Sequence, residues 1–329
     1  MRRYLSGTIV LACASTALFL CIGTASAQEN YPNRPLRMIV PWPPGQATDL
    51  AGRVVAQKLA ELLGQQIVID NRAGAGGVIG QELVSKAAPD GYTLAIGTTG
   101  TTVVSPLLVA GGKSPYALKD FTPIGMLAVA PLLLEVPASS PYKDVGAFLA
   151  NVRANPGKVS IGHSGNGTTN HVAILLLQDA MKLNFNVVAY KGSGPMLVDL
   201  VGGQIDSGLD QTSSSLAQVK AGKLRALAAC TSKRIADLPD VPTLAESGAP
   251  GFEAVTPSGL FAPAGTPPEV VKALGTAISH ALTQPAIQKR LAELGSEIRP
   301  MSPEEFTKFM QDEEARLKAL AAKGVLKGE

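Results

Sequence analysis

The segment RMIVPWPPGQATD, at residues 37–49, joins a short apolar run to the start of a helix. Residues 36–40 are mostly apolar and partly β-branched, which predicts a short strand that is covered on both faces. Pro41, Pro43 and Pro44 fix φ and remove backbone N–H donors, so the strand cannot continue. Gly45 then permits a backbone conformation that other residues avoid. The sequence therefore predicts a buried strand followed by a stiff turn.

A helix is expected to begin directly after this turn. Thr48 is a candidate N-cap, apolar residues recur at helical spacing, and Gly64 is a candidate stop. The free N–H groups of the first helical turn would face the space beyond the carboxyl end of the strand, where an anion is favoured. Taken alone, the segment is as compatible with an ordinary turn between a strand and a helix as with a turn that binds an anion.

The strand–loop–helix pattern recurs along the chain. Strands alternating with helices imply parallel pairing and a doubly wound sheet, whose ligands lie beyond the carboxyl ends of the strands. A small polar loop is expected at residues 98–102, after the third strand. The further strands are expected at residues 66–70, 93–97, 159–162, 186–189, 205–209 and 224–231, and the helices between them at 78–87, 145–155, 171–181, 195–201 and 214–221.

Two apolar segments, at residues 124–136 and 259–262, are expected to cross between two lobes and to act as the hinge. The residues after 262 are expected to be helical and to have no sheet of their own, so they must pack on one of the two lobes. Ser302 and Glu305 form a capping box at the start of its last helix. We predict a two-lobed α/β fold, each lobe a doubly wound, mostly parallel sheet. Lobe I would comprise residues 28–124 and 256–329, and lobe II residues 125–255.

The first 27 residues have the features of a secretory signal peptide: two basic residues, an apolar middle and the ending Ala25-Ser26-Ala27. Cleavage after Ala27 would release an exported, periplasmic protein. Without the two leader arginines the formal net charge falls from +3 to +1, which argues against nucleic-acid binding. Only Cys230 would remain, which excludes an internal disulfide. We expect a monomer.

The motifs of common enzymes are incomplete. Gly162-His163-Ser164-Gly165-Asn166 resembles a nucleophile elbow, but Asn166 replaces the final glycine and no histidine has a spacing that marks it as the base. The glycines of residues 74–80 match a dinucleotide fingerprint poorly and follow the wrong strand. Because the sequence also lacks a P-loop and a His/Cys metal motif, we expect no catalysis, no cofactor and no metal.

The loops at the predicted strand ends instead share small hydroxyl and amide side chains with glycine. They include Gln46 and Thr48, residues 98–102, residues 164–170, and Ser193. Such groups donate hydrogen bonds without carrying charge, and together with backbone N–H groups they can satisfy a carboxylate. Each loop alone could be polar simply because such residues suit turns and caps. Their recurrence at several strand ends favours a small-carboxylate site.

These segments, in this order, resemble the Bug-type extracytoplasmic solute receptors of tripartite tricarboxylate transporters. The resemblance covers essentially the whole chain after the leader. The matching segments are YPNRPLRMIVPWPPGQATD, NRAGAGGVIGQELVSKAAPDGYTL, SGNGTTNH, YKGSGP, AGKLRALAACTSKR, LPDVPTLAESG and GLFAPAGTP.

The resemblance implies a type II periplasmic-binding-protein fold that closes on a small carboxylate and delivers it to membrane subunits of the transporter. It also implies that two turns of lobe I and several loops of lobe II hold the ligand. The implied ligand-binding residues are Pro44, Gly45, Gln46, Ala47, Thr48 and Asp49 in the first turn; Thr98, Thr99, Gly100 and Thr101 in the second; and Ser164, Gly165, Asn166, Gly167, Thr168, His171, Tyr190, Lys191, Gly192 and Asp210 in lobe II.

The sequence departs from the resembled family at three positions. Gln46, Thr102 and Ser105 stand where that family usually has glycine, histidine and asparagine. Gln46 adds bulk and an amide at the first turn, so the identity of the carboxylate stays open. Two alternatives also stay open: an exported α/β enzyme, and a receptor that senses a carboxylate for a membrane signalling partner.

Overall fold

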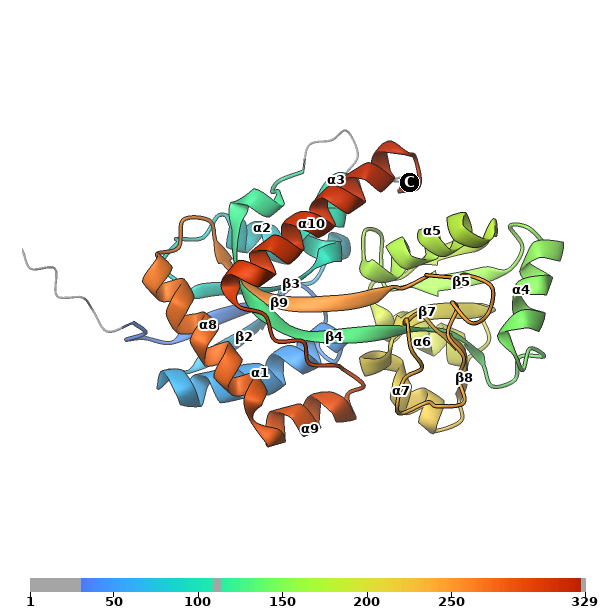
Figure 1. Ribbon diagram of the computed structural model, residues 1–329, viewed down its shortest axis with the longest axis horizontal. Coiled ribbons are helices and arrows are strands. Elements are labelled where there is room, and N and C mark those ends of the chain that lie inside the picture. The colour runs from blue at the N-terminus through green and yellow to red at the C-terminus, as the bar shows by residue number, and fades with distance from the viewer. Residues whose placement is uncertain (1–30, 109–113, 327–329) are drawn as a thin grey trace, which may run out of the picture.

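The computed structural model describes residues 31–108 and 114–326, which form two α/β lobes side by side (Figure 1). The predicted leader and its cleavage site lie outside the described residues. Two long strands, β4 (Phe121–Pro137) and β9 (Val255–Pro263), run between the lobes. The predicted two-lobed α/β fold is therefore confirmed.

The sheet of lobe I has the order β2-β1-β3-β9-β4. Strands β1 (Leu36–Val40), β2 (Ile67–Asn71) and β3 (Thr93–Thr98) pair in parallel, as the alternating pattern predicts. Strand β9 is antiparallel to both β3 and β4. The carboxyl ends of β1 and β3 consequently lie at the same edge of the sheet.

The sheet of lobe II is built in the same way. Strands β5 (Ser160–His163), β6 (Asn186–Ala189) and β7 (Ser207–Gln211) are parallel, and β7 and β8 (Leu224–Ala229) both pair antiparallel with the end of β4. Each lobe thus combines three parallel strands with antiparallel long strands, a mixed pairing that the sequence pattern does not reveal.

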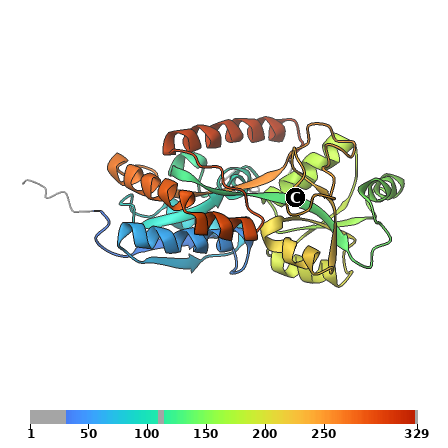
Figure 2. The same cartoon turned by 60° about the horizontal axis from the view of Figure 1, so that its bottom comes forward.

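Helices cover both faces of the sheets (Figure 2). In lobe I, Met38 and Val40 pack in one core cluster with helix residues such as Leu274, whereas Ile39 faces a second cluster that contains Phe306. This two-sided burial explains why β1 is a nearly continuous apolar run. The helices are α1 (Ala47–Leu63), α2 (Val78–Ser85), α3 (Ser105–Leu108), α4 (Val145–Ala154), α5 (Thr169–Met181), α6 (Ser193–Val201), α7 (Thr212–Lys220), α8 (Pro268–Thr283), α9 (Pro285–Glu293) and α10 (Pro303–Ala322), with short turns η1 (Ala75–Gly77), η2 (Gly100–Val104) and η4 (Leu118–Asp120).

The crossing strands change partners near Pro131. Up to the Pro131–Val255 pair, β4 is bonded to β9 in lobe I; from Leu132 onward it is bonded to β7 and β8 in lobe II. The predicted crossing within residues 124–136 is confirmed. The predicted lobe limits at 124/125 and 255/256 fall inside β4 and at the start of β9, and they stay a prediction.

Two local predictions are wrong. Helix α1 begins at Ala47, so Thr48 lies inside its first turn instead of capping it. Residues 100–104 form the π-helical turn η2 instead of a loop. Two features favour this turn. Thr102 Oγ1 donates a hydrogen bond to Thr98 O over 2.7 Å, and the side chains of Val103 and Val104 in the turn are buried. The Gly64 stop, in a left-handed conformation, and the Ser302/Glu305 capping box are confirmed.

Candidate functional site

A small polar cavity of about 10 Å³ lies between the lobes, at the carboxyl ends of the parallel strands. Its wall combines the turn after β1, the end of β3, the loop after β5, the end of β7 and one residue of β9. The convergence of strand ends that the sequence predicts is therefore present. The lining residues are Trp42, Gln46, Ala47, Thr48, Thr98, Ser164, Thr168, Thr169, Gln211 and Thr256.

The turn after β1 is held in place by the buried carboxylate of Asp49. One Asp49 oxygen accepts a bond from Gly45 N (2.9 Å), and the carboxylate also accepts from Arg53 and from Asn71 Nδ2 (2.9 Å). Burial alone would raise the pKa of Asp49, but these hydrogen bonds and the Arg53 charge hold it below its usual value. Asp49 therefore shapes the turn and does not line the cavity. Exposed Pro44 does not line it either.

The end of β3 is fixed by a local hydrogen-bond cluster. Thr101 Oγ1 accepts from Thr98 N (2.9 Å), and Thr101 N donates to Thr98 Oγ1 (3.2 Å). Thr98 lines the polar cavity, whereas Thr101 is buried behind it and Thr99 faces a different cavity. A Cβ on Gly100 would lie 2.8 Å from the backbone N of Thr169, so a glycine here lets the lobes approach each other.

In lobe II, the loop after β5 ends in a capped helix. Thr168 Oγ1 accepts from His171 N (3.3 Å), and the His171 ring accepts from Gly167 N (3.2 Å). The His171 ring stacks on His163 with centroids 4.5 Å apart. Burial, with a contribution from His171, lowers the pKa of His163 to about 3, so that ring is neutral. His171 thus positions the loop and does not line the cavity.

Asp210 lies within β7 instead of in the loop after it, because it pairs with Leu133 of β4. Its Oδ1 accepts from Ser193 Oγ (2.6 Å) and Asn170 Nδ2 (2.9 Å), while Oδ2 is buried without a partner among the described residues. Burial raises the pKa of Asp210 to about 7. Burial also raises the pKa of nearby Glu135 well above its usual value, and the Asp210 charge adds to the effect.

Hydrogen bonds join the two lobes directly across the site. Gln46 and Ser105, two of the positions where the sequence departs from the resembled family, both take part. The bonds are Gln46 Nε2 to Ser193 Oγ (3.4 Å), Ala47 N to Ser214 Oγ (3.3 Å) and Ser105 Oγ to Gly167 O (3.5 Å). The lobes are therefore closed on each other in this structure.

Several polar atoms in the wall of this cavity have no partner. Trp42 Nε1, Gln46 Oε1 and Thr169 Oγ1 are buried and make no hydrogen bond within the part of the chain that the structure describes. The first residues of α1 and α5, Ala47 and Thr169, also lie in the wall, so the positive ends of two helices face the cavity. Buried polar groups normally find partners, so this arrangement fits a polar, preferably anionic, ligand.

A larger outer cavity of about 950 Å³ adjoins the polar cavity and shares Trp42 and Ser164 with it. Its wall contains most of the remaining lobe II residues predicted for the site. The lining residues are Trp42, Pro43, Ala73, Gly74, Ala75, Gly76, Val78, Ser105, Leu108, Pro115, Ser164, Gly165, Asn166, Gly167, Ala189, Tyr190, Lys191 and Gly192.

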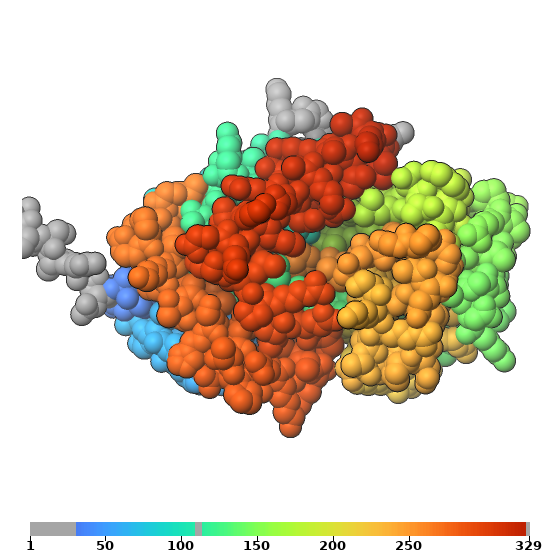
Figure 3. All heavy atoms as spheres, in the orientation of Figure 1, coloured from blue at the N-terminus to red at the C-terminus, as the bar shows by residue number. Residues whose placement is uncertain are grey.

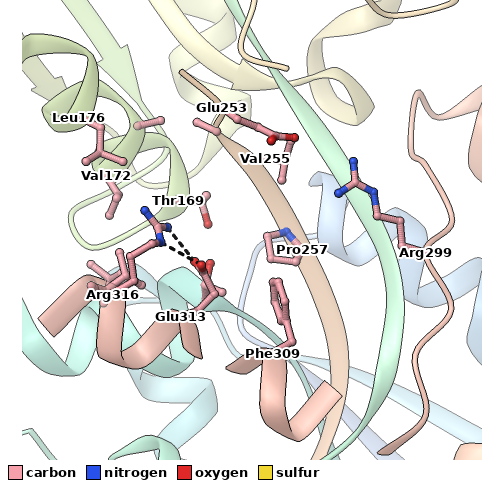
Figure 4. A pocket seen from close by; sticks show the side chains of 15 residues that line it. Thr169, Val172, Leu176, Glu253, Val255, Pro257, Arg299, Phe309, Glu313 and Arg316 are labelled. Atoms are coloured by element: carbon pink, nitrogen blue, oxygen red, sulfur yellow. Dashed lines mark hydrogen bonds and ion pairs between the residues drawn. The ribbon is translucent and has the colours of Figure 1, made fainter. Parts of the chain in front are cut away.

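Another cavity, of about 290 Å³, lies between α5 and α10 on the other side of β9 (Figure 4). Thr256 lines the polar cavity, whereas its neighbours Val255 and Pro257 line this rear cavity. Its wall is mostly apolar, and Glu313 and Arg316 of α10 form an ion pair of 2.8 Å beside it. Figure 3 shows α10 lying over the front of lobe I with its C-terminal end near lobe II.

The structure therefore brings 12 of the predicted residues into the walls of the polar and outer cavities. Gly45, Asp49, Gly100, Thr101, His171 and Asp210 instead support the walls from behind or shape their turns, and Thr99 lines the rear cavity. The sequence analysis did not identify Trp42, Gln211 and Thr256 as lining residues, and it included Thr169 only as part of the polar loop at residues 164–170. The position of Trp42 among the prolines of the turn could have indicated that it lines the site. Nothing in the sequence near Thr256 indicates this role.

The described residues contain no gathering of three or more His, Cys, Asp or Glu side chains that could hold a metal ion. Within the same residues, no helix is long and apolar enough to span a bilayer.

Comparison with known proteins agrees with the two-lobed fold. Residues 51–326 match the family described as the tripartite tricarboxylate transporter family receptor. BugT of Bordetella pertussis (strain Tohama I) is 36% identical over 292 residues, which are 89% of this chain and 90% of BugT. The fold resembles MatC from Rhodopseudomonas palustris with bound malate (TM-score 0.81, 36% identity, 87% of this chain and 98% of that chain covered). It also resembles R. palustris Rpa4515 with adipate (TM-score 0.86, 34% identity, 91% and 100% covered). The chain belongs to the tripartite tricarboxylate transporter receptor family, among its Bug-type members.

Proposed function

We propose that this protein captures a small carboxylate between its lobes, with a carboxylate group at the polar cavity, and delivers it to the membrane subunits of a tripartite tricarboxylate transporter. The observation that carries the proposal is the polar cavity itself. Trp42 and Thr169, whose Nε1 and Oγ1 are buried without a partner among the described residues, line this space together with the starts of two helices. The ligands named for two similar structures, malate and adipate, are carboxylates.

The energetics of this site are sufficient for specific binding. Micromolar affinity requires about 8 kcal/mol. Each helix start contributes up to about 2 kcal/mol to an anion in a partly buried site, and hydrogen bonds to a charged group contribute about 1.5 to 3 kcal/mol each. The binding free energy of a carboxylate can therefore be supplied without an arginine, by two helix starts, the indole N–H of Trp42 and a few hydroxyls, including that of Thr169.

Delivery to a transporter fits family membership and the predicted signal peptide. A protein that works outside the cytoplasmic membrane would bind the solute there and meet the membrane subunits as a closed complex. We infer that the residues of the two cavity walls hold the ligand. Buried Asp49, Thr101, His171 and Asp210 would act by positioning those walls.

A thermal-shift screen tests the proposal. A ligand that binds only the folded state raises the melting temperature by mass action, by an amount equivalent to about 2.7 kcal/mol at a hundred times Kd. Dicarboxylates, tricarboxylates, aromatic acids and amino acids form the test set, with neutral sugars as the control. At least one acid should raise the melting temperature and be recovered unchanged. A shift with sugars but with no acid would overturn the proposal.

A further inference from the structure

The outer cavity differs in character from the polar cavity beside it. Its wall is formed largely by apolar side chains and glycines. Trp42 and Leu108 belong to the lobe I side, and Ala189 and Tyr190 to the lobe II side. A ligand whose carboxylate occupies the polar cavity would extend into this space, because Trp42 and Ser164 belong to both walls.

Tyr190 belongs to the wall of this cavity, but its hydroxyl is not free to bind a ligand. Its hydroxyl donates to Asp199 Oδ2 over 2.9 Å, and burial together with this bond raises the pKa of Tyr190 to about 12. Ser105, another hydroxyl of the wall, is bonded to Gly76 O (3.2 Å). The outer cavity therefore offers surface for an apolar body and few free hydroxyls for a polyhydroxylated one.

The charge in the two walls is small. Lys191 is their sole charged residue among those that the structure describes, and it makes no ion pair with any described residue. Burying a carboxylate without a cation or several donors is strongly unfavourable. The site can thus accommodate one carboxylate in the polar cavity and at most one more near Lys191, which argues against a compact tricarboxylate.

The geometry points to an aromatic carboxylate as the ligand, with its carboxylate in the polar cavity and its ring in the outer cavity between Trp42 and Tyr190. This inference rests on the function proposed above and names its substrate class. Rings contribute a large buried apolar area and favourable contacts with other rings. A second carboxylate on the far side of the ring would lie toward Lys191.

Isothermal titration calorimetry with benzoate, terephthalate, succinate and citrate tests the inference. The full-length chain is expressed, and the exported protein is purified and titrated. We expect the two aromatic acids to bind at least about tenfold more tightly than succinate or citrate, because the ring buries apolar area that the other two lack. Ala189→Phe places a ring in the wall of the outer cavity, where it would compete with the ring of the ligand, and should lower the ratio of benzoate to succinate affinity about tenfold. Ala150→Phe, on the exposed side of α4, is its control.

Lys191→Met should weaken terephthalate more than benzoate, with exposed Lys158→Met as the control. Succinate or citrate binding as tightly as the aromatic acids would overturn the inference and leave carboxylate binding intact. An unchanged benzoate-to-succinate ratio in Ala189→Phe would also overturn it. Failure of all four acids to bind would instead contradict the proposed function. The ranking in the unmodified protein decides the matter even if a variant does not fold.

Discussion

In the lobe I wall of the site, the buried carboxylate of Asp49 is fully paired, whereas in the lobe II wall the buried carboxylate of Asp210 is paired at one oxygen. Asp49 accepts hydrogen bonds from Gly45 N, Arg53 and Asn71. Asp210 Oδ2 has no partner among the described residues, and neither does His163 Nε2 behind the same wall. The two carboxyl groups consequently differ in the direction of their pKa shifts: the pKa of Asp49 is lowered, and that of Asp210 is raised to about 7.

The difference indicates separate roles for the two walls. A fully bonded turn is rigid and holds the ligand donors in place before binding, which reduces the entropy that binding must offset. A buried acid that is half paired makes its wall sensitive to proton concentration. We therefore expect lobe I variants to act mainly through stability and pre-organisation, and lobe II variants through pH.

The largest effect is expected from Asp210→Asn. Because the folded-state pKa of Asp210 is raised, the stability that it contributes is present below pH 4 and is lost as pH rises to about 7. Asparagine cannot ionise, so the variant should lose less stability over this window, by about 2 to 4 kcal/mol. Urea unfolding at pH 4, 5, 6, 7 and 8 measures the difference from wild type. This difference also includes the effect on Glu135, whose pKa is raised in part by the Asp210 charge that the variant removes. Parallel pH profiles would mean that Asp210 titrates normally.

Asp49→Ala should destabilise the protein by about 2 to 3 kcal/mol, because Gly45 N and Asn71 lose their acceptor and Arg53 its carboxylate. The loss should be greatest above pH 4, where the lowered pKa keeps Asp49 ionised. Asp144→Ala, which removes the exposed N-cap of α4, is a matched control and should cost about 1 kcal/mol. A loss for Asp49→Ala no larger than that of the control would contradict a special role for this turn.

Gly100→Ala tests where the two walls meet. The added Cβ would lie 2.8 Å from Thr169 N of lobe II, so it should hinder closure but not the folding of either lobe. Overpacking of this kind costs about 1 to 3 kcal/mol, which lowers carboxylate affinity about five- to a hundredfold. Calorimetric titration measures the affinity, and the melting temperature without ligand is the control. An unchanged affinity would show that ligand binding does not require the close approach of Gly100 to Thr169.

The smallest effect is expected from Gln46→Gly, which restores the glycine usual in the family. It removes the amide that reaches Ser193 across the lobes at 3.4 Å. The change should alter affinity by about 1 kcal/mol and change the ranking of acids, because a buried donor and acceptor are lost. Titration of both proteins with the two best ligands measures it. Equal affinity ratios would mean that Gln46 only occupies the turn.

Much of the fold follows from local sequence signals. The proline-rich end of β1, the apolar crossing at residues 124–136 and the capping box at Ser302 depend on short-range backbone chemistry, and all three are present. The loops rich in hydroxyl groups also meet at one site, as parallel strands require.

The remainder depends on tertiary pairing. Asp210 belongs to a strand because β4 pairs with it from a distant part of the chain, and Thr256 reaches the cavity because β9 lies between two cavities. Neither partner can be identified from residues near these positions. Which polar residues line a cavity and which support it is likewise decided by long-range bonds, such as that of Asn71 to Asp49.

We propose that the two lobes enclose a carboxylate between a rigid wall and a pH-sensitive wall, and that β4 and β9 act as the hinge. Small-angle X-ray scattering of the purified protein, with and without its best carboxylate at saturation, measures this closure. We expect a smaller radius of gyration with ligand, and a smaller decrease for Gly100→Ala. An identical radius of gyration for the free and saturated wild-type protein would contradict closure over the ligand.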